Sequence, residues 1–386
     1  MCVVFGPILE YQTAWLARKI VVGLQRRGSF FSPTGTINLG GPLLNYYIVL
    51  TFCVHIPFKA TKILCDILQA IEMSSTVVAV AGGSGKLGRA IVESIVNAGG
   101  FTVFVLSREA TGDARLQGTD AKILAINYNK PDSIVEVLEK NRIDTVISTL
   151  GSMSGIEPEM ALIEAANRST VTKRYIPSTW GIKYTPEVAK IFSMAEGKIA
   201  YLNALEKTSL QYTSVINGFF LDYYVEPHVK SYLTGLTLAI DIANKAAAIP
   251  GSGNVPVVFT YSFDIGKFVA ALLGQSSWEK ESYIIGDKIT LNEFLAIAEE
   301  ARGTKFEATY DSLEKLRSYQ VTELPSHPPM YPYFPKQMLQ GMCAVFGILF
   351  EEGFFDLKPQ KSLNDQFPEI ETRKVRDLVN EAWKGK

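Results

Sequence analysis

The chain of 386 residues is 47% hydrophobic and 20% charged, and its formal net charge at pH 7 is −1. This composition is typical of a globular protein with one large or two smaller α/β domains. The balanced charge provides no basic surface for nucleic acid or an anionic membrane. The three histidines lie far apart and no cysteine–histidine cluster has metal-ligand spacing, which argues against a metal enzyme.

Residues 1–72 differ from everything that follows, because they show no alternation of strands and helices. Residues 41–58, GPLLNYYIVLTFCVHIPF, form the one membrane-like run, which barely reaches the length of a spanning helix and contains a proline. We expect an atypical N-terminal extension that is either disordered or wrongly included in the chain. An organellar presequence and a membrane anchor are the alternatives. The fold is expected to begin at Met73.

Three of the four cysteines precede residue 73, so the main body has only Cys343 and cannot form an internal disulfide. A lone cysteine suits a reducing compartment, and we expect a cytoplasmic protein without stable membrane association.

From residue 76 onward, apolar runs alternate with amphipathic stretches. The pattern predicts strands over 76–82, 101–108, 121–127, 144–151, 173–181 and 211–218, and helices over 86–98, 131–141, 157–169 and about 192–208. Apolar strands joined by helices favour a doubly wound parallel sheet of the Rossmann type. We place this core at 73–235.

Beyond the core the regularity weakens, and a smaller α/β portion for substrate binding is expected at 236–386, with late strands returning to the core. It contains a predicted strand over 282–287, a capped helix over 290–302, and a loop rich in proline and aromatic residues over 323–337. That loop either covers a cleft or packs as part of the structure.

A glycine-rich turn joins the first strand to the first helix. Gly82, Gly85 and Gly88 form GxxGxxG, and Gly83 with the last two also satisfies GxGxxG. Glycine permits a sharp turn, lets the backbone approach a pyrophosphate, and allows the helix to pack closely on the sheet, while the helix N-terminus attracts the anion. We therefore predict that this loop, with Lys86 and Leu87, binds a dinucleotide. A glycine-rich turn without a ligand is the alternative.

The choice of dinucleotide depends on Arg108 and Glu109 at the end of the second strand. An arginine there accommodates the 2′-phosphate of NADP, whereas an acid accepts the ribose hydroxyl of NAD. We favour NADP(H), with Arg108 as the phosphate contact. In the alternative Arg108 is solvated and Glu109 binds the ribose. Thr149 and Gly151 end the fourth strand, where the backbone is expected to pass the cofactor.

Four segments together resemble the NmrA-like family, the atypical short-chain dehydrogenase/reductase branch that also holds isoflavone reductase-like enzymes. They are VAGGSGKLGRAIV, RYIPSTWG, GKIAYLNALEKTSLQYTSVINGFFLDYY and ITLNEFLAIAEE, and the version here is similar to fungal members. The likeness covers about 74–385. It implies a Rossmann fold, NADP(H) binding and a substrate cleft beside the C-terminal portion. Some members reduce phenylpropanoid-type substrates, whereas others sense redox state and bind transcription factors.

The resemblance also implies site residues. Lys198 stands fourteen residues before Tyr212 and matches the active-site lysine of the reductases, and NGFF at 217–220 matches the segment beside the nicotinamide. The family motif PSEFG or PSEWG is matched by PSTWG at 177–181, where Thr179 replaces the glutamate and puts a role for that carboxylate in doubt.

The chemistry assigned to Lys198 has three alternatives. Ordinary short-chain dehydrogenases use YxxxK, but here Met194 takes the place of the tyrosine. Lys198 therefore handles the proton itself through a lowered pKa, or acts through a water, or only holds the nicotinamide ribose. A solvated surface lysine is the non-functional alternative.

Four further residues are candidates for substrate contacts. Ser178 ends the fifth strand, where it either contacts the ligand or satisfies a turn. Trp180, Asn217 and Phe219 are expected to line the pocket, although aromatic side chains at such positions are more often part of the core.

We therefore expect an NADPH-dependent reductase of a small aromatic or ketone-bearing metabolite. The alternative is a non-catalytic NADP(H)-sensing regulator that binds a protein partner. The retained lysine favours the enzyme, while homodimer formation stays open.

Overall fold

The computed structural model describes residues 75–110, 114–151 and 155–386. The expectations for residues 1–72, including the membrane-like run, lie outside these ranges. Within them, no helix is both long and apolar enough to cross a membrane.

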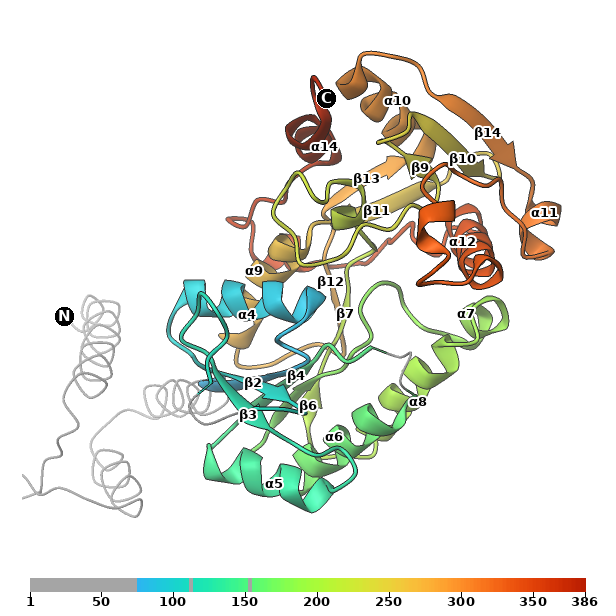
Figure 1. The fold of residues 1–386 in the computed structure, drawn as a ribbon. Coiled ribbons are helices and arrows are strands. Elements are labelled where there is room, and N and C mark those ends of the chain that lie inside the picture. The colour runs from blue at the N-terminus through green and yellow to red at the C-terminus, as the bar shows by residue number, and fades with distance from the viewer. Residues whose placement is uncertain (1–74, 111–113, 152–154) are drawn as a thin grey trace, which may run out of the picture. The chain divides into compact units, whose positions relative to one another are not determined.

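A six-stranded sheet organises the N-terminal part of the described chain (Figure 1). Its order is β3-β2-β1-β4-β5-β6 and every pairing is parallel. The strands are β1 (Val77–Ala81), β2 (Thr102–Ser107), β3 (Lys122–Ala125), β4 (Thr145–Ser148), β5 (Arg174–Ile176) and β6 (Gln211–Tyr212). The order reverses between β1 and β4, and such a reversal opens a crevice at the carboxyl ends of the strands.

Both faces of this sheet are covered by helices, which explains the continuous apolar runs of its strands. Along β1, Val78 and Val80 pack into the core that holds α4 and α9, whereas Ala79 and Ala81 pack into the core on the side of α5, α6 and α8. The bounds are α4 (Lys86–Ala98), α5 (Pro131–Lys140), α6 (Glu157–Arg168), α8 (Ala195–Leu205) and α9 (Ser262–Leu273). The predicted doubly wound sheet is confirmed, and the helix after the glycine loop has the predicted bounds.

The expected strand over 211–218 is wrong as a single element. It divides at Thr213 into β6 and β7 (Ser214–Ile216), and β7 pairs in parallel with β12 (Glu281–Tyr283). Thr213 is fully buried, and its hydroxyl lies 2.8 Å from that of Ser282. The chain changes partner at this point, because β12 returns from the C-terminal part to lie beside β7.

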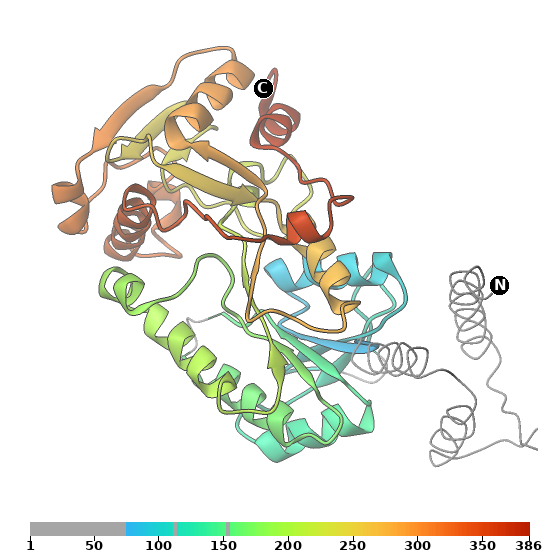
Figure 2. The same cartoon turned by 180° about the vertical axis from the view of Figure 1, so that it is seen from behind.

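The C-terminal part contains two three-stranded sheets, of order β14-β10-β9 and β13-β11-β8 (Figure 2). Its elements share a large apolar core. The strands are β8 (Phe219–Phe220), β9 (Ile240–Asp241), β10 (Ala246–Pro250), β11 (Pro256–Thr260), β13 (Asp287–Thr290) and β14 (Glu307–Asp311). The helices are α7 (Pro186–Ile191), η2 (Leu221–Tyr224), α10 (Leu291–Arg302), α11 (Leu313–Arg317), η3 (Pro328–Met330), α12 (Lys336–Glu351), α13 (Leu363–Gln366) and α14 (Val375–Trp383). The predicted cap of α10 is present, since Thr290 and Glu293 form a capping box.

Helix α9 follows the predicted boundary at 235 in sequence but packs directly on α4 of the Rossmann core (Figure 1). The two helices approach closely at Gly266, where a Cβ atom would stand 2.2 Å from Ser94 Oγ. The C-terminal residues thus complete one helical layer of the Rossmann core. The division at 235 and 236 stays a prediction.

Candidate functional site

The glycine loop leaves β1 in a conformation that only glycine adopts without strain. Gly82 has a φ of +75°, in the left-handed region. A Cβ atom on Gly88 would stand 2.4 Å from Gly82 O and 2.5 Å from Thr149 Oγ1, so the first turn of α4 lies against the loop and the end of β4. Gly82 and Gly88 are therefore required by the fold of the loop itself.

The N-terminus of α4 is left free for an anion. Gly85 is its N-cap, no side chain caps the helix, and its first turn has no acidic residue. A Cβ atom on Gly85 would have its nearest neighbour at 3.9 Å, so the space before the helix is open. Unpaired N–H groups, a favourable dipole and open space fit a pyrophosphate. Lys86 is exposed beside this space, whereas Leu87 is buried and anchors the helix.

At the end of β2, Arg108 and Glu109 are both exposed and available to a ligand. The charge of Arg108 acts on the Tyr128 phenol, whose pKa is raised chiefly by burial, so Arg108 lies near that ring. NADP selection by Arg108 stays a prediction.

The end of β4 links the glycine loop to the second half of the site. Thr149 Oγ1 donates to Ala81 O at 2.8 Å, directly beneath Gly82 and Gly88. The next carbonyl, Leu150 O, accepts a hydrogen bond of 2.8 Å from Ser178 Oγ. Gly151 follows and is exposed.

Ser178, just after β5, is held by three polar contacts. Besides the bond from its hydroxyl, its N–H donates to Glu159 Oε1 at 3.2 Å and its carbonyl accepts from Lys198 Nζ. The structure thus brings Ser178 and Lys198 together, and it connects them through Leu150 and Thr149 to the glycine loop. The turn interpretation and the ligand interpretation of Ser178 are both compatible with this geometry.

Lys198 is buried, with 8% of its surface exposed, and lies on the inward face of α8 with Ala195, Tyr201 and Leu205. Burial lowers the pKa of its ammonium group to about 8, and the negative charge of Glu159 opposes this effect. Its Nζ also lies 5.4 Å from the centre of the Tyr201 ring. This position differs from that of a solvated surface lysine, and a group with this pKa can release and regain a proton near neutral pH.

Glu159 was not anticipated from the sequence, although it is fully enclosed beside Lys198. Its carboxylate accepts hydrogen bonds from Ser148 Oγ, from Tyr175 OH at 3.0 Å and from the Ser178 N–H. Burial raises its pKa, against the effect of these bonds and of the Lys198 charge. A signal exists in the sequence, because residues 159, 162, 163 and 166 form the buried stripe of α6 and the first of them is a carboxylate.

Three predicted site residues have structural partners. The Trp180 indole donates to Ser148 O at 2.9 Å, Asn217 Oδ1 accepts from Gly181 N at 3.0 Å, and the Asn217 amide donates to Gly218 O. Phe219 is 3% exposed and packs among the rings of Tyr223, Tyr224, Phe259, Phe346, Phe350 and Phe355. Substrate contacts by Trp180, Asn217 and Phe219 stay predictions. Thr179, at the family's glutamate position, is fully buried with its hydroxyl 2.8 Å from that of Ser214.

The loop over 323–337 is fixed to the body by His327. Its Nδ1 accepts from Leu324 N at 3.2 Å, and its Nε2 lies 3.0 Å from Thr237 O. Burial lowers the pKa of this imidazole. The start of the loop therefore packs as part of the structure, while Tyr333 near its end is 90% exposed.

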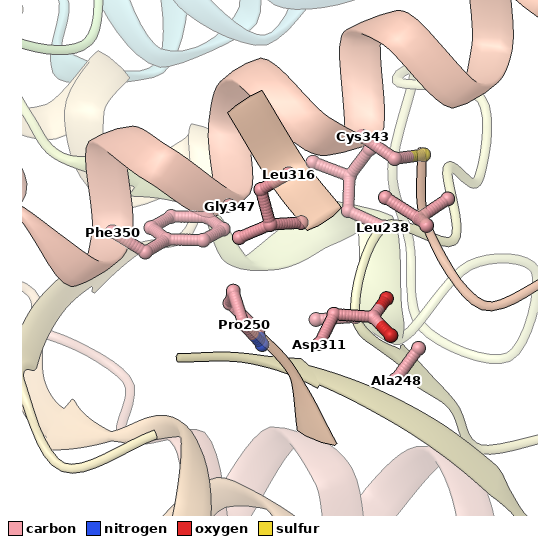
Figure 3. A pocket seen from close by; sticks show the side chains of 10 residues that line it. Leu238, Ala248, Pro250, Asp311, Leu316, Cys343, Gly347 and Phe350 are labelled. Atoms are coloured by element: carbon pink, nitrogen blue, oxygen red, sulfur yellow. The ribbon is translucent and has the colours of Figure 1, made fainter. Parts of the chain in front are cut away.

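A small pocket lies between β10 and α12 and is lined mainly by apolar side chains such as Leu238, Leu316 and Phe350 (Figure 3). The carboxylate that lines it, Asp311, accepts hydrogen bonds from Lys315 and Thr322. The pocket contains none of the predicted site residues. Among the described residues, no group of three or more histidine, cysteine or acidic side chains is placed to hold a metal ion.

Comparison with known families agrees with this geometry. A model described as the NmrA-like family matches residues 74–372. The protein named Oxidoreductase BOA1 from Botryotinia fuckeliana (strain B05.10) is 33% identical over 298 residues, which cover 76% of this chain and 95% of that protein. Isoflavone reductase homolog P3 from Arabidopsis thaliana is 29% identical, over 64% of this chain and 81% of that protein. The expected resemblance, including its likeness to fungal members, is confirmed.

A solved structure confirms the fold. The binary complex of leucoanthocyanidin reductase with NADPH from Vitis vinifera superposes with a TM-score of 0.62, at 19% sequence identity, and covers 79% of this chain and 98% of that one.

Proposed function

We propose a function for this chain, which belongs to the NmrA-like family: it is an NADPH-dependent reductase of a small aromatic or ketone-bearing metabolite, and Lys198 handles the proton. One observation carries the proposal. Lys198 is buried, has a lowered pKa and donates to the carbonyl of Ser178, just after the carboxyl end of β5. Ser178 in turn bonds to Leu150 O, at the end of β4 beside the glycine loop and the uncapped N-terminus of α4. Carboxyl ends of strands at a point where the strand order reverses are the place where open α/β sheets bind ligands.

The oxidoreductase class and the cofactor also follow from the relatives. The fungal relative and the plant homologue are named as an oxidoreductase and an isoflavone reductase homologue, and the structural neighbour contains NADPH. The predictions of an NADP-dependent oxidoreductase and of NADP(H) as its cofactor are confirmed at this level. The substrate and the role of Lys198 are part of the proposal.

The residues of the chain divide the work. The loop from Gly82 to Gly88 and the N–H groups of α4 would hold the pyrophosphate, and Arg108 would hold the 2′-phosphate. The bound nicotinamide would supply a hydride to an electrophilic carbon of the substrate. Lys198 then donates a proton to the substrate oxygen that gains negative charge, and the resulting neutral amine takes a proton back from water.

The surroundings of Lys198 prepare it for that step. Among the described residues, Lys198 Nζ donates a hydrogen bond to Ser178 O, and its other N–H groups are left for a substrate. Its pKa of about 8 keeps most of the group protonated at neutral pH while making proton release easier than from a solvated lysine. Ile156 and Met194 present exposed apolar side chains at the starts of α6 and α8, which suits a substrate with a hydrophobic ring.

Substitution of Lys198 tests the proposal. In Lys198→Ala of the full chain we expect turnover of the preferred substrate to fall about 10²- to 10⁴-fold, the usual contribution of general acid–base catalysis, while the affinity for NADPH changes by less than about threefold. Lys207→Ala is the matched control, because Lys207 lies two residues after the end of α8 and is exposed. Turnover that survives in Lys198→Ala with unchanged cofactor affinity would contradict the assignment.

The pH profile gives a second readout of the same variant. A general acid acts in its protonated form, so kcat of the unmodified enzyme should fall as pH rises through about 8. Lys198→Ala should lose this limb. NADPH binding without turnover on a broad panel of aromatic and carbonyl substrates would support the NADP(H)-sensing regulator instead.

A further inference from the structure

We propose that Glu159 is the positioning residue of the Lys198 site: its carboxylate holds the Ser178 peptide against Lys198 and supplies the negative charge that faces the buried ammonium. This inference rests on the proposed function for its catalytic meaning but makes a claim about the two side chains that can be tested without a substrate.

The carboxylate is held from three directions by β4, β5 and the turn after β5. Ser148 Oγ donates to Glu159 Oε2, and Tyr175 OH and the Ser178 N–H both donate to Oε1. The residue is 2% exposed, so its position is set by these bonds and not by solvent. Hydrogen bonds to a buried carboxylate are stronger than those between neutral groups and fix its orientation.

The Ser178 peptide connects the two charged groups. Its N–H donates to Glu159 and its C=O accepts from Lys198 Nζ, so one peptide unit lies between the carboxylate and the ammonium. Helices α6 and α8, which carry the two groups on their buried faces, pack against each other. Without the carboxylate, the Ser178 N–H and the Tyr175 hydroxyl would lose this acceptor, and the Lys198 ammonium would lose the negative charge that faces it.

The other titratable groups around Glu159 do not replace its charge. They are Tyr128, Tyr175 and Tyr201, and the nearby carboxylate together with burial raises the pKa of each phenol, to about 12 for Tyr201. All three stay uncharged over the neutral range. Arg108 acts on Tyr128, and Glu157 acts on Tyr201. Glu159 is the group whose charge acts on the pKa of Lys198.

The test measures the pKa of Lys198 directly in the full chain. Competitive labelling with acetic anhydride over a pH series, quantified by mass spectrometry on the peptide that contains Lys198, reports its ionisation without turnover. In Glu159→Gln we expect the apparent pKa of Lys198 to fall by about one unit, because a facing negative charge favours the ammonium form. Glu164→Gln is the matched control, since Glu164 lies on the same helix but is exposed and pairs with Arg168.

A pKa of Lys198 that is unchanged in folded Glu159→Gln would overturn the inference. If that variant does not fold, Glu159→Asp shortens the side chain and moves the carboxylate charge away from Lys198, and the pKa of Lys198 should fall in the same direction by a smaller amount. No change in folded Glu159→Asp would then overturn the inference.

In an active enzyme, the alkaline limb of kcat should move to lower pH in Glu159→Gln while KM for NADPH stays constant. A merely structural role would change stability without moving this limb. A lowered pKa of Lys198 in a protein that reduces nothing would support the inference and reject the proposed function.

Discussion

The two halves of the site are built in different ways. The glycine loop is made from one short segment of backbone, and its shape depends on residues that lack a side chain, Gly82 and Gly88. The Lys198 site is made from side chains on β4, β5, α6 and α8, which meet only after the sheet and its helices have assembled. The loop offers a surface that many enzymes of this fold share, whereas the buried polar groups decide the chemistry.

This difference predicts different kinds of failure. A side chain added to the loop should block the cofactor by occupying space, while a change in the Lys198 site should alter ionisation and turnover with the cofactor still bound. Three substitutions test whether cofactor binding and turnover depend on different residues.

The largest effect is expected for Gly88→Ala. Its new Cβ atom would meet Gly82 O and Thr149 Oγ1 at 2.4 and 2.5 Å, so the loop or the helix must shift. We expect a loss of about 1–3 kcal/mol in the free energy of unfolding and at least an approximately 100-fold loss of NADPH affinity, measured by chemical denaturation and by calorimetric titration.

Gly85→Ala is the matched control for strain, because the nearest neighbour of its new Cβ atom would be 3.9 Å away. It should keep full stability while weakening NADPH. Normal binding by Gly88→Ala would show that the cofactor does not lie on this loop.

A smaller and more selective effect is expected for Arg108→Ala. Loss of a charge-assisted hydrogen bond to the 2′-phosphate should weaken NADPH binding about 10- to 100-fold and leave NADH binding unchanged. Glu109→Gln is the control, since its side chain is exposed one position further along the same turn. The opposite result would be a loss of NADH affinity in Glu109→Gln with unchanged NADPH affinity in Arg108→Ala. It would mean that Glu109 binds the ribose hydroxyl and that the cofactor preference is reversed.

The same difference explains what the sequence reveals. The order of the elements was predictable because strand burial and helix periodicity are local, and the glycines were predictable because positive φ and close approach exclude other residues. Lys198 was found through a resemblance, not through its pattern. Glu159 was missed because a glutamate in the first turn of a helix is an ordinary partner of the helix dipole, although it begins the apolar stripe of α6. The division of 211–218 into β6 and β7 depends on β12, about seventy residues later, which no local pattern reports.

The smallest effect is expected at Phe219, where an expected pocket residue has a core environment. Six aromatic rings surround this side chain, whose exposed fraction is 3%. Phe219→Leu should therefore lower the free energy of unfolding by about 1 kcal/mol and leave KM for the substrate within about twofold. Tyr333→Leu is the control for loss of an aromatic ring, because Tyr333 is 90% exposed and should change neither quantity. A large rise in KM with unchanged stability would place Phe219 against the substrate after all, and would extend the Lys198 site beyond its polar groups into the aromatic core.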